Sequence, residues 1–383
     1  MEPSALPLSR RRFAQLLGLG VATTALHPSL AVAGRGLRRV SAKAAQTASP
    51  AVTGVVRLSS NENPYGPSAA AFDAMRAAFD LAWRYPDEGV DALAADVAAH
   101  HHIGSDHILL GDGSSEILKL CAAAFTGAGR PAVIAEPTFE AVARYARSGG
   151  AEVKAVPLTP EYRHDLPRML AAAGGSGLLY ICNPNNPTAT ITPKEALNAF
   201  LADLPAGITA LVDEAYFHYA DDPDYESVIP LTKDHPNLIV ARTFSKVYGM
   251  AGLRCGYAVA RPDTLALLRA HQAWDTLNVM AVAAARASLA DQEHVGQSRR
   301  LNREAKSYVA SELETLGYKL IPSSTNFLMA DLRRPVGPVI EALKQRKVEV
   351  GRVFPALPTH LRVTIGTKPQ MKAFVSALRQ VLA

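Results

Sequence analysis

The chain has 383 residues, of which 48% are hydrophobic and 20% are charged, and no residue type dominates. This length and composition are typical of a globular protein with a large core and room for a second, smaller domain, and they exclude the fibrous and disordered classes. The formal net charge is only +5, and the charges are too scattered along the chain to predict a nucleic-acid partner.

The first 33 residues predict an export signal. The stretch "SRRRFAQLLGLGVATTAL" joins a basic start to an apolar run too short to span a membrane, and small residues follow in "AVAG". Ser9 to Phe13 resemble the twin-arginine export signal, which predicts a cut between Ala33 and Gly34. An amphipathic helix with a basic end is the alternative.

We therefore expect residues 1–33 to be a signal peptide recognised by the twin-arginine export machinery, and residues 34–55 to be a flexible mature lead. The protein would then be periplasmic or otherwise exported, and cytoplasmic if the signal is not used.

Six short apolar runs alternate with amphipathic stretches of helical length, and together they predict an α/β fold. Continuous apolar strands are typical of a mostly parallel sheet that is covered on both faces. Helices over residues 139–148, 193–202 and 262–273 would supply this cover. The six strands are predicted at residues 131–137, 152–158, 177–184, 208–216, 237–244 and 255–260.

The C-terminal part of the chain begins with a long polar helix over residues 292–316. It leads to "GYKLIPSSTNFLMADL" and then to "LRVTIGT", a pattern that indicates a smaller α+β domain. We expect a large domain over residues 81–285, a small C-terminal domain over residues 286–383, and an N-terminal segment over residues 56–80 that packs on the small domain.

Three cysteines, Cys121, Cys182 and Cys255, are far apart and each lies in an apolar context. This predicts buried free thiols rather than a disulfide framework or a metal cluster. We expect no metal site.

Polar residues follow several predicted strands, where ligands of open α/β sheets collect. "GDGSSE" at residues 111–116 ends a strand and opens a helix, so its amides and hydroxyls can hold a phosphate, although most serine caps hold no ligand. Asn186 in "NPNNPT" belongs to a turn, and its amide can also bind a phenolate-like oxygen. Asp213 ends an apolar strand three residues before Tyr216, and a buried carboxylate there needs a cationic partner or stays protonated.

Lys246 lies in "TFSKVYGMAGLRCGY", among small and hydroxyl side chains, with Arg254 eight residues later. A lysine removed from water and placed near cations has a lowered pKa and becomes a nucleophilic amine that can react with an aldehyde. The alternative is a lysine at a helix start whose amine reaches solvent.

In combination, "GDGSSE", "NPNNPT", "DEAY" and "TFSKVYGMAGLRCGY" resemble the motifs of the fold-type I pyridoxal-phosphate enzymes, the aspartate aminotransferase superfamily. "LSSNENPYGPS" and "WRYPD" are most similar to its histidinol-phosphate aminotransferase branch. The resemblance extends over residues 55–383, and it implies that the large domain binds pyridoxal 5'-phosphate.

The resemblance also implies roles for single residues. Lys246 would form the covalent link to the cofactor and later move the proton between substrate and cofactor, while Asp213 would pair with the pyridinium nitrogen and make the ring an electron sink. Tyr216 and Asn186 would hydrogen-bond the phenolic oxygen, and Phe139 would stack on the ring, where an apolar core residue is the alternative. The cofactor phosphate would be held by Gly113, Ser114, Ser115, Thr243, Ser245 and Arg254.

Substrate residues are implied at both ends of the chain. Arg362 in "HLRVTIGT" resembles the arginine that binds the amino-acid carboxylate, and a strand arginine pointing to solvent is the alternative. Asn61, Tyr65 and Arg352 resemble residues that close over the substrate, which Asn186 would also contact. Tyr85 resembles a tyrosine that reaches the cofactor phosphate of the neighbouring subunit, which implies a homodimer with shared active sites.

Two positions depart from the family pattern. Ala189 replaces the usual glycine after "NPT", so the turn must avoid a positive φ or accept strain. Asp275 in "WDTLN" replaces an asparagine-containing stretch, which would alter what the pocket accepts.

We expect an aminotransferase that moves an amino group between an amino acid or a phosphorylated amino alcohol and a 2-oxo acid such as 2-oxoglutarate. A decarboxylase or lyase on the same fold is the first alternative, because the sequence does not determine which bond of the α-carbon lies perpendicular to the ring. A non-catalytic binding protein is the second, and the presence of Lys246, Asp213 and Arg254 argues against it.

Overall fold

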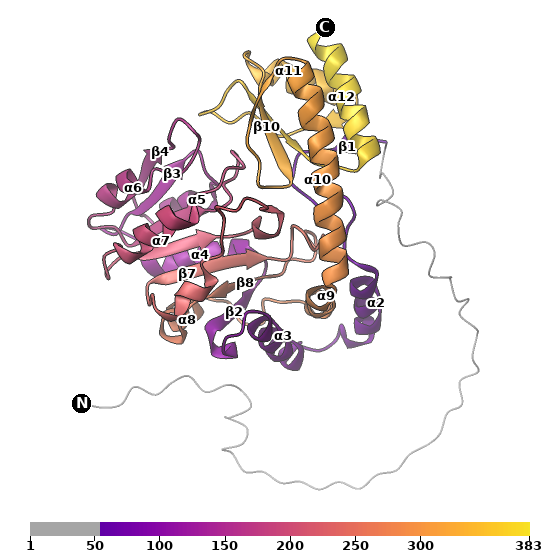
Figure 1. Cartoon of the computed structure of the whole chain (residues 1–383). Helices are drawn as coiled ribbons and strands as arrows, with labels where there is room; N and C mark the ends of the chain where they lie inside the picture. The colour runs from indigo at the N-terminus through magenta and orange to yellow at the C-terminus, as the bar shows by residue number, and fades with distance from the viewer. Residues whose placement is uncertain (1–53) are drawn as a thin grey trace, which may run out of the picture. The chain divides into compact units, whose positions relative to one another are not determined.

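The computed structural model describes residues 54–383, which belong to one compact unit (Figure 1). The predicted signal peptide, and the predicted lead apart from its last two residues, lie outside the described residues. Within the described part of the chain, no helix combines the length and apolar character needed to cross a membrane.

A seven-stranded sheet forms the centre of the large domain, with strand order β2-β8-β7-β6-β5-β3-β4. Neighbouring strands run parallel, except that β8 is antiparallel to both β7 and β2. This confirms the predicted α/β fold with a mostly parallel sheet. The strands are β2 (Ile108–Gly111), β3 (Ala132–Glu136), β4 (Val153–Pro157), β5 (Leu178–Cys182), β6 (Thr209–Asp213), β7 (Leu238–Thr243) and β8 (Gly256–Val259).

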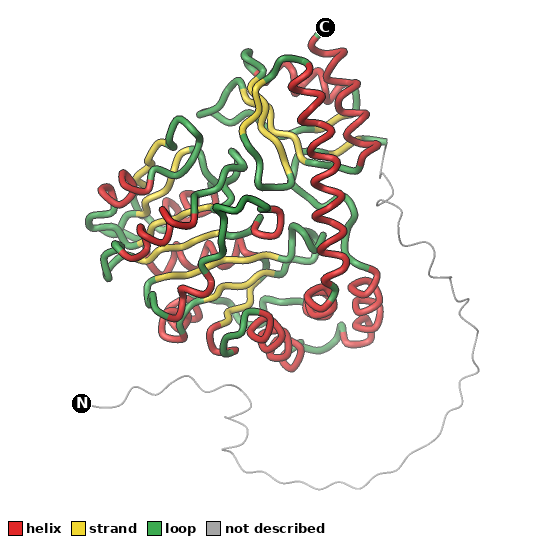
Figure 2. Tube along the Cα trace, in the orientation of Figure 1, coloured by secondary structure: helices red, strands yellow, loops and turns green. Residues whose placement is uncertain are grey.

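Helices cover both faces of this sheet (Figure 2). Along β5, Leu178 and Tyr180 join one hydrophobic cluster while Leu179 and Ile181 join another, so alternate residues are buried on opposite faces. The surrounding helices are α3 (Asp87–His100), α4 (Ser114–Phe125), α5 (Ala141–Ser148), α6 (Leu166–Ala172), α7 (Lys194–Ala202) and α8 (Pro262–Arg269), with short 3₁₀ helices at η1 (Phe79–Leu81), η2 (Ser105–His107), η3 (Phe217–Tyr219) and η4 (Ile229–Lys233).

Helix α8 is shorter than the predicted helix over residues 262–273. Its last turn tightens, because the amides of His271 and Gln272 donate to carbonyls only three residues earlier. The side chains of Arg269 and Gln272 then donate to the carbonyls of Ile108 and Leu110 on the edge strand β2. The chain therefore leaves the helix to cover a sheet edge.

The C-terminal part has its own sheet and its own hydrophobic cluster, as predicted for an α+β region. Strands β12 (His360–Thr364), β10 (Phe327–Asp331) and β9 (Lys319–Ile321) form an antiparallel sheet. Val309 and Phe374 lie in the centre of a hydrophobic cluster separate from those of the large sheet. The helices here are α10 (Gln292–Thr315), which packs against α12 (Lys368–Leu382), and α11 (Val336–Gln345).

The segment over residues 56–80 divides between the two parts, whereas packing on the small domain was predicted for all of it. Strand β1 (Val56–Arg57) pairs in parallel with β11 (Val348–Glu349) of the C-terminal part. Helix α2 (Ala69–Ala78) instead packs on α9 (Val279–Ala290), and its Ala71 joins the core of the large sheet. Small alanine side chains on both helices allow this close packing.

The predicted boundary at residues 285 and 286 falls inside α9, because both Ala285 and Leu289 pack in the core of the large sheet. The three cysteines are free and buried, which confirms their prediction.

Candidate active site

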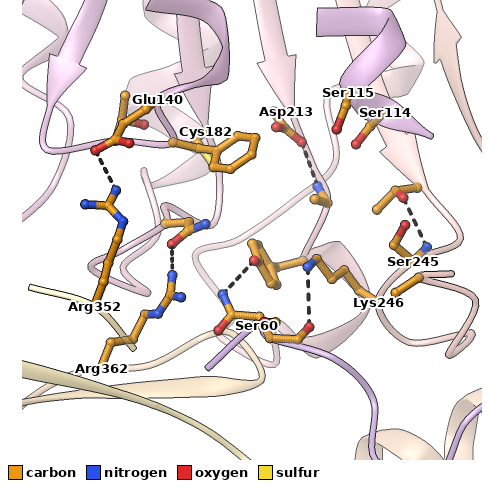
Figure 3. A pocket seen from close by; sticks show the side chains of 18 of the residues that line it. Ser60, Ser114, Ser115, Glu140, Cys182, Asp213, Ser245, Lys246, Arg352 and Arg362 are labelled. Atoms are coloured by element: carbon orange, nitrogen blue, oxygen red, sulfur yellow. Dashed lines mark hydrogen bonds and ion pairs between the residues drawn. The ribbon is translucent and has the colours of Figure 1, made fainter. Parts of the chain in front are cut away.

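A cavity of about 370 Å³ lies at the carboxyl ends of β5, β6 and β7 (Figure 3). Its walls come from the starts and ends of many elements, including the start of α4, the loop after β3 and the C-terminal sheet. Thirteen of the predicted residues line it: Asn61, Ser114, Ser115, Phe139, Asn186, Asp213, Tyr216, Thr243, Ser245, Lys246, Arg254, Arg352 and Arg362.

Lys246 points into this cavity from the loop after β7. Its Nζ donates a hydrogen bond to the carbonyl of Asn61 at 3.3 Å and lies 5.3 Å from the ring centre of Tyr216. Burial, and secondarily the charge of Arg362, lower the pKa of Lys246 to about 8. The amine is therefore directed at the cavity and not at bulk solvent, as a nucleophile requires.

Asp213 ends β6 as a fully enclosed carboxylate, only 2% exposed. Its Oδ2 accepts a hydrogen bond from the Tyr180 hydroxyl at 3.0 Å, and its Oδ1 accepts from the amide of Ala215 at 3.1 Å. It makes no ion pair with any residue in the described part of the chain, and burial raises its pKa to about 6. A positively charged group bound in the cavity would satisfy this carboxylate.

A candidate anion site lies where α4 begins. Gly113 precedes the helix with φ +75°, and a Cβ at this position would collide with the guanidinium of Arg254. Arg254 donates to Ser245 Oγ at 3.3 Å and to the carbonyl of Asp112 at 3.3 Å. The backbone amides at the start of α4, the hydroxyls of Ser114 and Ser115 and the Arg254 guanidinium thus border the same volume. This combination of donors suits a phosphate group.

Asn61 connects the N-terminal segment to the floor of the cavity. Its Nδ2 donates to the hydroxyl of Tyr216 at 2.9 Å, while its Oδ1 accepts from Thr364 Oγ1 at 3.0 Å. Its carbonyl also accepts from Asn326 Nδ2 at 3.0 Å. Sequence reasoning missed Thr364 and Asn326, because both act through residues about 300 positions away; the only local signal was their occurrence in "LRVTIGT" and "STNFL".

Two arginines from the C-terminal part form the opposite side of the cavity (Figure 3). Arg362 donates to Asn186 Oδ1 at 2.7 Å and to the carbonyl of Ser59 at 2.8 Å, so it does not point to solvent. Its Nε is buried and has no partner among residues 54–383. Burial lowers the pKa of Arg362. Arg352 donates to Glu140 Oε1 at 2.6 Å.

Sequence reasoning also missed Glu140 and Phe354, which line the cavity beside these arginines. The guanidinium carbons of Arg352 and Arg362 lie 4.5 and 5.2 Å from the ring centre of Phe354. The signal for Glu140 was its position directly after Phe139. Phe139 itself is 37% exposed, which contradicts the alternative of a core residue.

Three predicted site residues, Gly113, Tyr65 and Tyr85, lie outside the lining. Gly113 stands directly behind it, in contact with Arg254. Tyr65 is half-buried away from the cavity, and Tyr85 is 68% exposed. Asp275 is exposed and does not line the cavity within this chain. Ala189 has φ +67°, so the turn accepts the strain that a glycine would avoid.

The chain is similar to aminotransferases of known sequence and structure. A family model described as aminotransferase class I and II matches residues 53–378. A histidinol-phosphate aminotransferase of Moorella thermoacetica is 40% identical over 336 residues, covering 87% of this chain and 86% of that protein. A histidinol-phosphate aminotransferase of Symbiobacterium thermophilum is 42% identical over 330 residues, covering 86% of this chain and 91% of that protein.

A solved structure is similar over the same region. The histidinol-phosphate aminotransferase of Sinorhizobium meliloti, in complex with pyridoxal-5'-phosphate, superimposes with a TM-score of 0.82 at 28% identity. The match covers 86% of this chain and 91% of that one.

Proposed function

Because this chain belongs to the class I and II aminotransferases, which are pyridoxal-phosphate enzymes, we propose that it transfers the amino group of histidinol phosphate to a 2-oxo acid such as 2-oxoglutarate. The observation that carries the proposal is the pair of guanidiniums, Arg352 and Arg362, on the side of the cavity opposite the anion site at α4. A substrate that bears a phosphate or carboxylate fits such a pair.

The residues present fit the cofactor. Asp213 is a buried carboxylate without a cationic partner in the described chain, and Gly113 leaves the space that Arg254 occupies beside the anion site. When bound, pyridoxal 5'-phosphate supplies an aldehyde and an electron-accepting ring. Asp213 would hold its ring nitrogen, Arg254 and the start of α4 its phosphate, and Asn186 and Tyr216 its phenolic oxygen, while Phe139 would cover the ring.

Lys246 would perform the proton transfer. Its Nζ lies beside the Asn61 carbonyl in the centre of the lining, and a lowered pKa lets it accept a proton from the substrate α-carbon near neutral pH. Tyr216, held by Asn61 Nδ2, packs against this amine and limits its positions. Arg362 would orient the acidic group of the substrate, since it lines the cavity and its Nη1 is held in place by Asn186 Oδ1.

The test is to load the purified protein with cofactor, add histidinol phosphate and 2-oxoglutarate, and identify the products by mass spectrometry. We expect glutamate and the ketone of the donor in equal amounts, and a turnover lowered by at least several orders of magnitude in Lys246→Ala. Release of carbon dioxide or ammonia without glutamate would contradict the proposal and favour a decarboxylase or lyase. Near-normal turnover by Lys246→Ala would contradict the role of the lysine.

We further propose a homodimer in which Tyr85 completes the site of the neighbouring subunit. Five of the exposed large hydrophobic side chains in the described chain lie within residues 72–85: Phe72, Phe79, Leu81, Trp83 and Tyr85. Exposed apolar side chains gathered in one segment are typical of a protein interface. Tyr85 does not line the cavity of its own chain, so a contribution to a site requires a second copy.

We also propose export through the twin-arginine machinery, which rests on residues 9–13 and the small residues before Gly34. Protein recovered from the periplasm should begin at Gly34. Arg10→Lys combined with Arg11→Lys should keep the protein in the cytoplasm; unchanged export of this variant would exclude that route.

A further inference from the structure

Glu140 is an acidic side chain at the substrate end of a cavity whose other charged residues at that end are arginines. It follows Phe139 in the loop between β3 and α5, and its Oε1 accepts a hydrogen bond from Arg352 at 2.6 Å. Among the lining residues the only other carboxylate is Asp213, which is held by Tyr180 at the end of β6. Figure 3 shows the Glu140–Arg352 pair at the edge of the cavity, away from Ser114 and Ser115.

This pair is accessible to a substrate. The side chains of Arg352 and Glu140 are 52% and 66% exposed, so neither is enclosed by protein. Glu140 Oε2 has no hydrogen-bond partner in the part of the chain that the structure describes. An exposed ion pair contributes about 1 kcal/mol or less to stability, so either partner can exchange it for a substrate group.

An aminotransferase binds two different substrates in one cavity in turn. We propose that Glu140 is a specificity-determining residue, which binds an N–H donor on the distal group of the amino donor, such as an imidazole or an amine. In the other half-reaction Arg352 binds the distal carboxylate of the acidic substrate. The opposite charges of one ion pair thus serve both half-reactions. The substrate assignment rests on the proposed function.

The simplest competing interpretation is that Glu140 only fixes the position of Arg352. The two interpretations differ for substrates of the same size, because a phenyl ring offers no N–H donor to a carboxylate. They also differ with pH, because an imidazole with a pKa of about 6.5 is mostly cationic at pH 6 and mostly neutral at pH 8.

The experiment compares Glu140→Gln with the parent in single half-reactions of the cofactor-loaded enzyme with histidinol phosphate, phenylalanine and glutamate. We expect kcat/KM for histidinol phosphate to fall about tenfold relative to phenylalanine at pH 6 and less at pH 8, as the loss of a charge-assisted hydrogen bond predicts. The value for glutamate should stay within about twofold. Arg352→Gln should show the reverse preference. Glu312→Gln is the matched control, because Glu312 and Arg379 form a partly exposed pair at 2.7 Å and neither residue lines the cavity.

A binding measurement separates this inference from the proposed function. The probes are 3-(imidazol-4-yl)propionate and 3-phenylpropionate, which have no amino group and cannot react. Glu140→Gln should weaken binding of the imidazole probe about tenfold at pH 6 and leave the phenyl probe unchanged. Equal losses for both probes, or no loss for either, would overturn the role of Glu140. A parent enzyme that binds the imidazole probe in this way but transaminates no donor would instead contradict the proposed function alone.

Discussion

Lys246 and Asp213 face the same cavity, and burial shifts both towards their neutral forms. The pKa of the amine falls to about 8, and that of the carboxylate rises to about 6. Desolvation is the largest cause for each, because the charged form loses more hydration than the neutral one. The two groups therefore titrate closer to neutral pH than ordinary surface residues, where a reactive aldehyde and a ring nitrogen would bind.

The lowered pKa of Lys246 predicts how the rate of covalent cofactor capture depends on pH. Only the neutral amine attacks an aldehyde, so the capture rate should rise about tenfold per pH unit below pH 8 and level off above it. The measurement mixes cofactor-free protein with pyridoxal 5'-phosphate for short times, reduces with borohydride and quantifies modified Lys246 by mass spectrometry. A blocked lysine in solution is the control, and its rate should still rise near pH 10. A capture rate of Lys246 that still rises near pH 10 would refute its lowered pKa.

The raised pKa of Asp213 predicts how the stability of the cofactor-free protein depends on pH. Its pKa in the folded state, about 6, exceeds the ordinary value of 3.8, so its contribution to stability is complete below pH 3.8 and is lost as pH rises through 6. The full loss is about 3 kcal/mol, of which about 1 kcal/mol falls between pH 5 and pH 8. Asp213→Asn should lack this loss. Urea unfolding of the parent and of Asp213→Asn at pH 5 and pH 8 measures the free energy of unfolding. An equal change with pH in both proteins would contradict the raised pKa of Asp213.

The residues that we propose to act on the cofactor could be found in the sequence because each lies in a contiguous motif. Lys246, Asp213 and Arg254 are recognisable from their immediate neighbours in the sequence. Thr364 and Asn326 could not be predicted, because their roles come from hydrogen bonds to Asn61, far away in the chain. The role of Glu140 likewise depends on Arg352, a residue 212 positions later.

At the scale of elements, the cavity depends on where strands end and helices begin. Strands β5, β6 and β7 each deliver a lining residue at their carboxyl ends, while α4 presents its first amides to the anion site. The pattern of apolar residues predicted these strands well, because a parallel strand that is buried on both faces consists of a continuous run of hydrophobic residues. It did not predict the end of α8, which depends on hydrogen bonds to β2.

The start of α4 gives the next prediction. Gly113→Ala should lower cofactor affinity at least tenfold, because the added Cβ would displace the Arg254 guanidinium and an alanine at φ +75° and ψ 166° is strained by about 1–3 kcal/mol. Spectroscopic titration of the cofactor-free protein with pyridoxal 5'-phosphate measures the affinity. Gly207→Ala is the matched control, since nothing lies within 4 Å of a Cβ there. Equal affinities for the two variants would show that Arg254 does not depend on this glycine.

At the scale of the whole molecule, the cavity joins two parts of the chain that have separate cores. Arg362 on β12 donates to Asn186 of the large domain, and Arg352 donates to Glu140. Arg299 and Arg303 of α10 make a further connection to Asp221. Any movement of the C-terminal sheet would therefore change the substrate end of the cavity while leaving Asp213 and the anion site in place.

The proposed homodimer would extend this dependence to a second copy of the chain, through the exposed side chains within residues 72–85. If Tyr85 serves the neighbouring subunit, Tyr85→Phe should lower cofactor affinity about tenfold, because the phosphate loses one hydrogen bond to a charged group. This loss should occur although Tyr85 is 68% exposed in its own chain and lies outside its cavity. Sedimentation of the parent should give a dimer at the concentrations of the assay.

Mixing two inactive or weakened variants tests directly whether two subunits share each active site. A mixed dimer of Lys246→Ala and Tyr85→Phe subunits has one site with both defects and one site with neither, because the lysine comes from one chain and the tyrosine from the other. At low cofactor concentration, equal mixing after subunit exchange should therefore restore about a quarter of the parental activity. Mixing Lys246→Ala with Asp213→Asn is the control, because both residues line the cavity of the same chain. There each mixed dimer carries one defect in each site, so no activity returns. Restoration in neither mixture would mean that each chain builds its site alone, and restoration in the control would mean that Lys246 and Asp213 of one site come from different chains.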